Sequence, residues 1–400
     1  MTVSTRPSSG RQARPTLFTP AFTILSLASL AYFSAAGMLL PALPRYVHGS
    51  LGGGDVAVGV TFGAFSLTAV VFRPWAGLLG DRRGRRPLMI AGALVAAASV
   101  AGYGLTTTPA ALAVLRLLTG AGEACFFVGM ATTFADLAPP ARRGEAMSLA
   151  SLALYLGIGT GPLMAEVTMA RLGTTAVWVA AAATTLLAAT LATRVPETRP
   201  TRPPGDDGPA NRRLVHPAGL LPGLILLTSI IGMAGYLAFV PLHVTDLGMS
   251  GSASLLALFA AIVVAIRSAG ARLPDLLGPR RAIRTALALS VAGLTVAGTW
   301  LVPLGLVLGT VLLGFGIALL TPSVFALAVA DVPADERGQV MGTTTAFIDL
   351  AFGAGPVTMG VVAAAFGRPA VFLVGALFAL AGLAVVSSPR VRRPELLASR

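Results

Sequence analysis

The sequence predicts an all-α membrane protein of the twelve-transmembrane-helix type, with two six-helix bundles, and three observations support this fold class. The chain is 55% hydrophobic and only 11% charged, and its mean hydropathy of +0.81 does not fit the surface of a water-soluble protein. The apolar residues fall into twelve runs, most of which approach the roughly 20 residues that cross a bilayer as a helix. Polar residues of the first half also return in the second half at a constant spacing.

The apolar runs are separated by Gly, Pro and Arg residues and are too long for the strands of a membrane barrel. Helices are the expected form, because every backbone polar group in lipid must be bonded within its own segment. The run that follows Arg14 is longer than the core of a signal peptide, so we expect an uncleaved first span. The predicted spans are 17–40, 56–79, 88–106, 110–135, 145–169, 174–193, 219–242, 253–272, 282–302, 304–330, 339–363 and 369–388.

The arginines predict the orientation of the chain. All 29 basic residues are Arg, and 23 of them fall on one side when the loops between spans are counted alternately. Only Arg45, Arg171 and Arg368 fall on the other side. The positive-inside rule therefore predicts a protein of the inner (plasma) membrane with both termini in the cytoplasm. Because topology explains the net charge of +13, no nucleic-acid partner is expected.

A polar segment divides the chain into two halves. Residues 194–218 are rich in Pro, Arg and Asp, so they are predicted to be a cytoplasmic linker between a first bundle at 1–193 and a second at 219–400. Two parallel repeats of six spans are the ground plan of a secondary transporter with its site near the bilayer midplane. The repeat has an offset of 194 and pairs Arg73 with Arg267, Asp81 with Asp275, Gly84 with Gly278, Arg143 with Arg337, and Gly161-Pro162 with Gly355-Pro356.

The segment between the second and third spans carries a family resemblance. The sequence GLLGDRRGRRP (77–87) resembles the signature loop of the major facilitator superfamily at essentially every position. RLLTGAG (116–122) and DLAPPARRGEA (136–146) resemble the family's elements in and after the fourth span. The resemblance covers the whole chain and implies a carrier that works by alternating access.

The resemblance implies a conformational latch at the cytoplasmic end of the second span. Asp81 is expected to form a charge cluster with Arg85 and Asp136, and to face the N-terminus of the eleventh span near 338–339. These contacts would hold the two halves together on the cytoplasmic side while the protein opens outward. An alternative is that the arginines serve only as topology anchors. The residues assigned to the latch are Gly77 for close helix approach, Gly84 for a tight turn, and Asp81, Arg82, Arg85, Arg86 and Asp136.

A second element, GIGTGP (157–162), is similar to the antiporter element of drug:proton exporters, although Ala165 and Glu166 stand where that element usually has a Gly pair. Its residues Gly157, Gly161 and Pro162 are expected to bend the fifth span and allow close packing. Packing alone is the alternative reading, because small residues at this spacing are common in membrane helices. Candidate walls of a substrate pocket are Tyr32, Phe126, Phe127, Tyr155, Tyr236, Phe239 and Phe347.

Ionisable residues inside the spans are candidates for function. Glu123 is the candidate proton or substrate-cation site, because a carboxyl group removed from water can exchange a proton near neutral pH; a structural hydrogen-bonding role is the alternative. Arg116 shares its helix face seven residues earlier, too far away for direct contact. Glu166 is expected near the outer surface, paired with Arg45 or Arg171. The predicted coupling residues are Arg73, Arg116, Glu123 and Asp349.

Arg73 and Asp349 are expected at comparable depth, on spans that are neighbours across the two halves in this family. A bridge between them is therefore predicted, and protonation of Asp349 would loosen it. At the offset of 194 this pair corresponds to Arg267 and Tyr155, so a softer Tyr-to-Arg contact is predicted in the other half.

Together these features predict a secondary active transporter for proton-coupled efflux of a small hydrophobic drug or secondary metabolite. The alternative is a facilitator or proton symporter that imports a sugar, amino acid or other metabolite. A channel fits the repeat less well, and an enzyme is not expected, because no span carries paired acids, a His cluster or a nucleophile with a base. The single Cys125 and three scattered histidines predict no metal site, and no cofactor is expected. The predicted partners are a small-molecule substrate, protons and the lipid bilayer, bound by a monomer.

Overall fold

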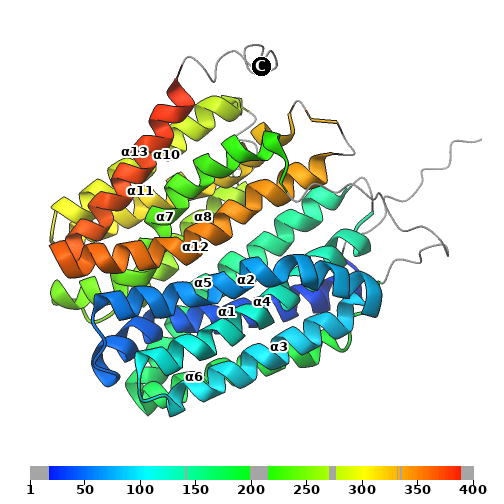
Figure 1. Ribbon diagram of the computed structural model, residues 1–400, viewed down its shortest axis with the longest axis horizontal. Coiled ribbons are helices and arrows are strands. Elements are labelled where there is room, and N and C mark those ends of the chain that lie inside the picture. Colours follow the sequence, from blue (N-terminus) through cyan, green and yellow to red (C-terminus); the bar gives the residue numbers. More distant parts are fainter. Residues whose placement is uncertain are drawn as a thin grey trace, which may run out of the picture.

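The computed structural model describes residues 18–139, 142–198, 215–269, 276–330, 332–333 and 336–388. All regular structure in these ranges is helical, and long helices follow one another along the chain (Figure 1). They are α1 (Pro20–Arg45), α2 (Asp55–Arg83), α3 (Arg85–Ala101), α4 (Pro109–Leu137), α5 (Arg143–Leu172), α6 (Thr174–Ala192), α7 (Pro217–Asp246), α8 (Ala253–Ala269), α10 (Pro279–Thr299), α11 (Pro303–Val329), α12 (Arg337–Phe366) and α13 (Arg368–Ser387).

Eleven of the helices in the described ranges are long and apolar enough to cross a bilayer, and α8 is a shorter apolar helix of 17 residues. Each lies within a few residues of a predicted span. The predicted all-α membrane fold is thereby confirmed. Residues 1–17, 199–214 and Asp275 lie outside the described residues, as does the end of the predicted span 253–272; the proposed linker and domain boundaries stay predictions.

Residues 80–87, between the predicted spans 56–79 and 88–106, were expected to form a loop. This prediction is wrong, because almost all of the segment is helical. Helix α2 continues to Arg83 and α3 begins at Arg85, so Gly84 alone separates them. Its φ of +104° belongs to a region that residues with a side chain rarely adopt. Arginine is a good helix former, which explains why the Arg-rich ends extend the helices.

The helix boundaries support the internal repeat. Helices α5 and α6 of the first half are separated by Gly173, and α12 and α13 of the second half by Gly367, 194 residues later. These glycines have nearly equal φ values, +81° and +82°. Helices α3, α4, α5 and α6 begin 194 residues before α10, α11, α12 and α13. The backbone thus repeats more faithfully than the side chains do.

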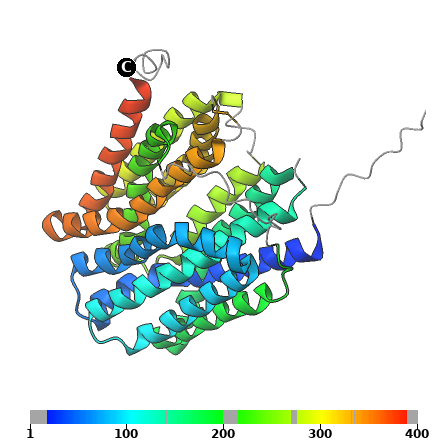
Figure 2. The same cartoon turned by 45° about the vertical axis from the view of Figure 1, so that its right-hand side comes forward.

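The first six helices form one bundle and the last six form the other (Figures 1 and 2). At the seam between the bundles, α2 packs against α12 and α5 packs against α8. We call the end of the molecule where α2 passes into α3 the linker end, and the opposite end, where α5 passes into α6, the far end. Successive helices run in alternate directions between these two ends (Figure 1).

The contact between α2 and α12 is closest toward the far end. A Cβ atom added at Gly59 would collide with the carbonyl oxygen of Pro356, and one at Gly63 with that of Gly353. At Gly77, nearer the linker end, no atom lies within 4 Å of such a Cβ. The close helix approach expected at Gly77 is therefore not present, because the tight part of the seam lies toward the other end of α2.

Candidate functional site

Three charged residues meet at the middle of the seam. Arg73 of α2 donates a hydrogen bond to Asp349 Oδ2 of α12, and its Nη2 lies 3.4 Å from Glu123 Oε1 of α4. The guanidinium also stacks over the ring of Phe127, 4.7 Å from its centroid. The predicted Arg73–Asp349 bridge is confirmed as a contact, and Glu123 joins it. We call these three residues the acidic cluster.

The acidic cluster carries an excess of negative charge when its acids are ionised, because two carboxylates share one guanidinium. The side chains are 24% (Arg73), 15% (Glu123) and 11% (Asp349) exposed, so they are largely removed from solvent. Glu123 Oε2 is buried without a hydrogen-bond partner. Such a site can accept one proton and reach neutrality, which is the chemistry expected of a coupling site.

Arg116, assigned to the coupling set from the sequence, lies elsewhere. Its Nε donates to the carbonyl oxygen of Thr61 and its Nη2 to that of Phe62, each at 3.1 Å. The guanidinium stacks over Phe65 at 4.7 Å, and the side chain is buried. Arg116 therefore ties α4 to α2, and the expected absence of direct contact with Glu123 is confirmed.

A related contact lies between α5 and α8, at the place across the seam where the repeat predicts it. Arg267 of α8 lies 4.6 Å above the ring centroid of Tyr155 of α5, and its Nη2 is 3.4 Å from the phenol oxygen. The predicted Tyr-to-Arg contact is confirmed. Within the described residues Arg267 has no carboxylate partner.

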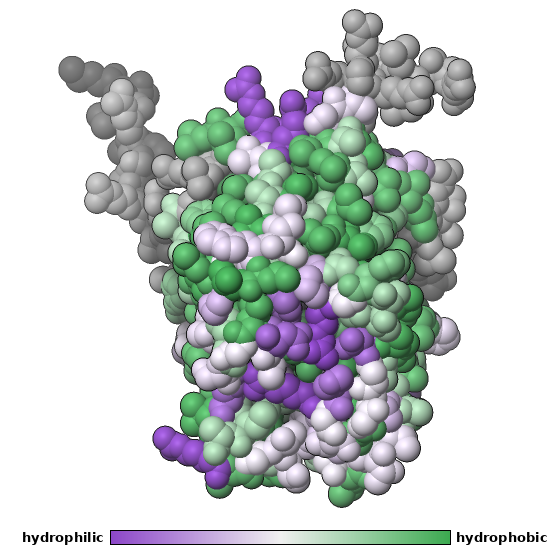
Figure 3. All heavy atoms as spheres, turned by 90° about the vertical axis from the view of Figure 1, so that its left-hand side faces the viewer, coloured by the Kyte–Doolittle hydropathy of each residue, from purple (hydrophilic) through white to green (hydrophobic). Residues whose placement is uncertain are grey.

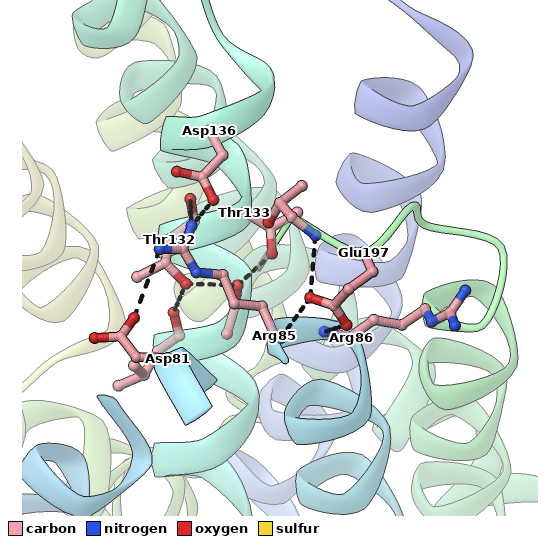
Figure 4. Close-up of polar contacts among 10 residues, drawn as sticks. Asp81, Arg85, Arg86, Thr132, Thr133, Asp136 and Glu197 are labelled. Carbon is pink, nitrogen blue, oxygen red and sulfur yellow. Dashed lines mark hydrogen bonds and ion pairs between the residues drawn. The ribbon is translucent and has the colours of Figure 1, made fainter. Parts of the chain in front are cut away.

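A second group of charges gathers at the linker end around Arg85 (Figure 4). Arg85 forms an ion pair with Asp136 of α4 and lies 3.8 Å from Asp81 of α2. Glu197, just after α6, accepts the backbone N–H groups of Arg85 at 2.8 Å and Arg86 at 3.3 Å. A carboxylate at a helix N-terminus satisfies unpaired N–H groups and complements the helix dipole. The charge cluster implied by the resemblance is present, and Glu197 is an addition to it.

All these linker-end contacts lie within the first bundle. Among the described residues the ion-pair partner of Asp81 is Arg85, and the expected approach of Asp81 to the start of α12 near 338–339 stays a prediction. Arg82 is exposed and has no ion pair within the described chain. Gly84 makes the predicted tight turn. The described structure thus brings Asp81, Arg85 and Asp136 together within the first bundle, and their role as a latch stays a prediction.

At the far end, by contrast, charged residues connect the bundles. Arg368, the first residue of α13, reaches Asp55 of α2 at 3.3 Å and Asp246 of α7 at 2.7 and 3.0 Å. Its Nη2 is also 3.4 Å from His48 Nε2. Figure 3 views this end of the molecule and shows hydrophilic residues across its middle. The sequence analysis missed this tie, because it used Arg368 only for the orientation of the chain and did not consider Asp55.

Glu166 forms a second connection at the far end. Its Oε1 is 3.2 Å from Arg45 Nη2, which confirms one of the two predicted partners. The same oxygen accepts the backbone N–H of Ser252 at 2.7 Å and of Ala253 at 3.0 Å, at the N-terminus of α8. Glu166 belongs to α5, so the first bundle caps a helix of the second.

The antiporter-like element packs within the first bundle. A Cβ added at Gly157 would lie 2.6 Å from Phe33 Cβ, and one at Gly161 would lie 2.6 Å from the backbone of Gly37, so α5 and α1 approach closely. Pro162 lies inside the continuous helix α5. The predicted close packing is confirmed.

The predicted pocket walls divide into two groups. Tyr32 stacks on Phe126 with ring centroids 4.0 Å apart, close to the acidic cluster through the neighbouring residue Phe127. Tyr236 and Phe239 are fully buried, as Phe126 is, and their assignment to a pocket wall stays a prediction. Among the described residues no group of His, Cys, Asp and Glu could hold a metal ion.

Comparisons with known proteins agree with this architecture. The profile of the Major Facilitator Superfamily matches residues 25–294 and 269–399. An uncharacterised MFS-type transporter of Salmonella typhimurium is 29% identical over 375 residues, which cover 90% of this chain and 94% of that protein. A second MFS-type transporter, from Burkholderia pseudomallei, is 28% identical over 397 residues, or 96% and 95% of the two chains.

Solved structures share the fold at lower identity. The human organic anion transporter MFSD10 (TETRAN) has a TM-score of 0.69 and 23% identity, over 92% of this chain and 100% of that one. A bacterial homologue of the human lysosomal transporter Spinster, in an inward-facing and occupied conformation, has a TM-score of 0.74 and 15% identity, over 91% and 95% of the chains. With the profile match over nearly the whole sequence, the chain belongs to the Major Facilitator Superfamily and is a secondary transporter rather than an enzyme.

Proposed function

We propose that this transporter exports a small hydrophobic drug or secondary metabolite from the cytoplasm in exchange for protons. In this proposal it is a monomer of the inner membrane, and the linker end faces the cytoplasm. The distribution of arginines supports the orientation, because only Arg45, Arg171 and Arg368 fall among the far-end loops. The antiporter-like element at 157–162 supports exchange rather than symport.

The observation that carries the proposal is the acidic cluster at mid-depth. Arg73 is shared by Glu123 of the same bundle and Asp349 of the opposite bundle. Protonation of either carboxyl group removes the excess negative charge and weakens its hold on Arg73. Since Asp349 is the partner across the seam, its protonation loosens a tie between the bundles and links proton binding to the movement of the bundles.

Export then follows from alternating access. The far-end ties hold the bundles together while substrate and cluster are reached from the linker end. Opening at the far end breaks the contacts of Arg368 and Glu166 across the seam and exposes the cluster to the outer proton concentration. Named functions of structural relatives fit a small organic substrate: MFSD10 is an organic anion transporter and NupG a nucleoside transporter.

The test is proton-coupled transport by variants of the cluster. A strain without its own exporters, expressing this protein, is screened against a panel of drugs, and each hit is added to everted vesicles with an acidic interior. We expect the hit to release protons, Glu123→Gln and Asp349→Asn to abolish this release, and Glu336→Gln, which alters an exposed acid paired with His216 of the same bundle, to preserve it. Full proton release by Glu123→Gln, or uptake into the cytoplasm down a proton gradient, would contradict the proposal.

A further inference from the structure

The acidic cluster has a twofold-related counterpart from which both acids are missing. At the offset of 194, Arg73 corresponds to Arg267, Asp349 to Tyr155, and Glu123 to Ile317. Tyr155 has a phenol in place of a carboxyl group, and Ile317 is an apolar residue that is almost completely buried. One site therefore has more acids than bases, and its counterpart has a base without an acid.

The surroundings of Arg267 leave much of its hydrogen-bonding capacity unused. The guanidinium has five N–H donors and stays charged at any physiological pH. Its contacts within the described residues are the ring of Tyr155 and a long hydrogen bond of 3.4 Å to the phenol oxygen. Its Nε is buried without a partner. A cation at membrane depth is unfavourable without a counter-charge, and the described residues place no carboxylate beside Arg267.

We infer that Arg267 and Tyr155 receive an anionic group of the transported molecule, and that the substrate is a small amphipathic organic anion, such as an aromatic carboxylate. The inference rests on the proposed transport function and specifies its substrate class. A carboxylate fits the planar donor array of a guanidinium, and the Tyr155 hydroxyl offers a further donor beside it.

Each of the two guanidinium groups lies over an aromatic ring, Arg267 over Tyr155 and Arg73 over Phe127, which gives the apolar part of such a molecule an aromatic surface beside the charge. Phe127, which lies beneath Arg73, is in edge contact with Phe33, with ring centroids 6.5 Å apart. An amphipathic anion can thus place its charge at Arg267 and its apolar part against the ring of Tyr155, while the acidic cluster takes the proton.

The test compares acids with their own methyl esters. Purified protein in detergent is titrated with naphthoate, anthracene-9-carboxylate and pyrenebutyrate and with the methyl ester of each, and binding is followed by ligand fluorescence and by the rise in unfolding temperature. For at least one pair we expect the wild type to bind the acid about 10-fold more tightly, because the charge-assisted hydrogen bonds are lost in the ester. No proton gradient is needed for this measurement.

Three variants connect the preference with the site. Arg267→Gln is expected to lower the acid-to-ester ratio to about 1, and Arg267→Lys to keep a reduced preference, since it retains the charge without the planar array. Tyr155→Asp supplies the acid that Asp349 provides in the other half, and is expected to remove the preference as Arg267→Gln does. Arg284→Gln is the control: Arg284 of α10 also has a buried Nε without a partner, but it stacks on no ring in the described structure.

A wild type that binds no acid more tightly than its ester overturns the inference, and so does an unchanged ratio in folded Arg267→Gln protein. An acid preference that disappears in Arg267→Gln and Tyr155→Asp but persists in Arg284→Gln supports it. The proposed function is judged separately, by whether the preferred acid drives proton release in vesicles. Binding without proton coupling would leave the anion site intact and refute the exchange mechanism.

Discussion

The two ends of the molecule use charged residues in different ways. At the far end the ionic contacts cross the seam: Arg368 joins Asp55 of the first bundle, and Glu166 caps a helix of the second. At the linker end, the contacts of Arg85 and Glu197 stay within the first bundle. The difference shows that the same chemistry, a carboxylate with an arginine or a helix N-terminus, stabilises one bundle at one end and joins two bundles at the other.

This comparison defines what the ends are expected to do. Substitutions at the linker end should lower the stability of the first bundle without changing how often the far end opens. Substitutions at the far end should favour opening there. Because Cys125 is the only cysteine, opening can be measured in a Cys125→Ser background with a reporter, Ser66→Cys, which is buried on the seam face of α2.

The largest effect is expected for Gly84→Ala at the linker end. An alanine at a φ of +104° is strained, and its Cβ would lie only 2.5 Å from Glu197 Oε2. We expect a loss of about 2–3 kcal/mol in the free energy of unfolding, measured as a lower unfolding temperature in detergent. Gly77→Ala, where the structure leaves space for a Cβ, is the matched control and should change it by less than about 0.5 kcal/mol. Equal effects of Gly84→Ala and Gly77→Ala on the free energy of unfolding would show that the tight turn at Gly84 does not stabilise the linker end.

Arg368→Ala is expected to have the largest effect on opening. It removes the contact across the seam and leaves Asp55 and Asp246 without their shared partner. We expect the reporter cysteine to react about 10-fold faster with an impermeant thiol reagent added outside intact cells. Arg171→Ala removes an exposed far-end arginine with no ion pair among the described residues, and should leave the rate unchanged. If the reporter cysteine reacted no faster in Arg368→Ala than in the parent protein, the contacts of Arg368 would not be what holds the far end closed.

The two carboxylates that cap helices, Glu166 and Glu197, allow a direct comparison of the two ends. Glu166→Ala and Glu197→Ala each remove a carboxylate from a helix N-terminus, which contributes about 1 kcal/mol. We expect Glu166→Ala to increase reporter labelling about 5-fold, since its α8 cap lies across the seam. Glu197→Ala should lower the unfolding temperature and leave labelling unchanged. If both variants changed labelling equally, the division between the ends would be wrong.

The smallest effect is expected for Arg82→Gln. Arg82 is exposed and forms no ion pair in the described structure, so its loss should change the free energy of unfolding by less than about 0.5 kcal/mol. Unfolding of Arg82→Gln and Asp136→Asn in parallel checks this, because Asp136 does pair with Arg85 and should be the more sensitive position. A larger loss of unfolding free energy in Arg82→Gln than in Asp136→Asn would indicate that Arg82 also makes a stabilising contact in the latch.

The sequence predicted the helices well because hydropathy and Gly/Pro punctuation are local properties of the chain. The Arg73–Asp349 contact could also be predicted, because depth along a helix follows from residue counting and the family resemblance makes the two spans neighbours. The position of Arg116 could not, since its helix face and the carbonyl groups opposite it are set by packing. Glu197 and Arg368 were missed for a related reason: their partners are brought to them by the meeting of helix ends far apart in the sequence.

The contact of Gly59 and Gly63 with α12 has a mechanical consequence. Since α2 presents no side chain at these two positions and meets the backbone of α12, the contact can serve as a fulcrum for rotation of one helix on the other. From Gly63 to Arg83 the lever arm of α2 is about 30 Å, so a rotation of about 10° displaces its tip by about 5 Å. A small tilt at the fulcrum is thus amplified into a displacement wide enough to admit a small molecule between the lever tips.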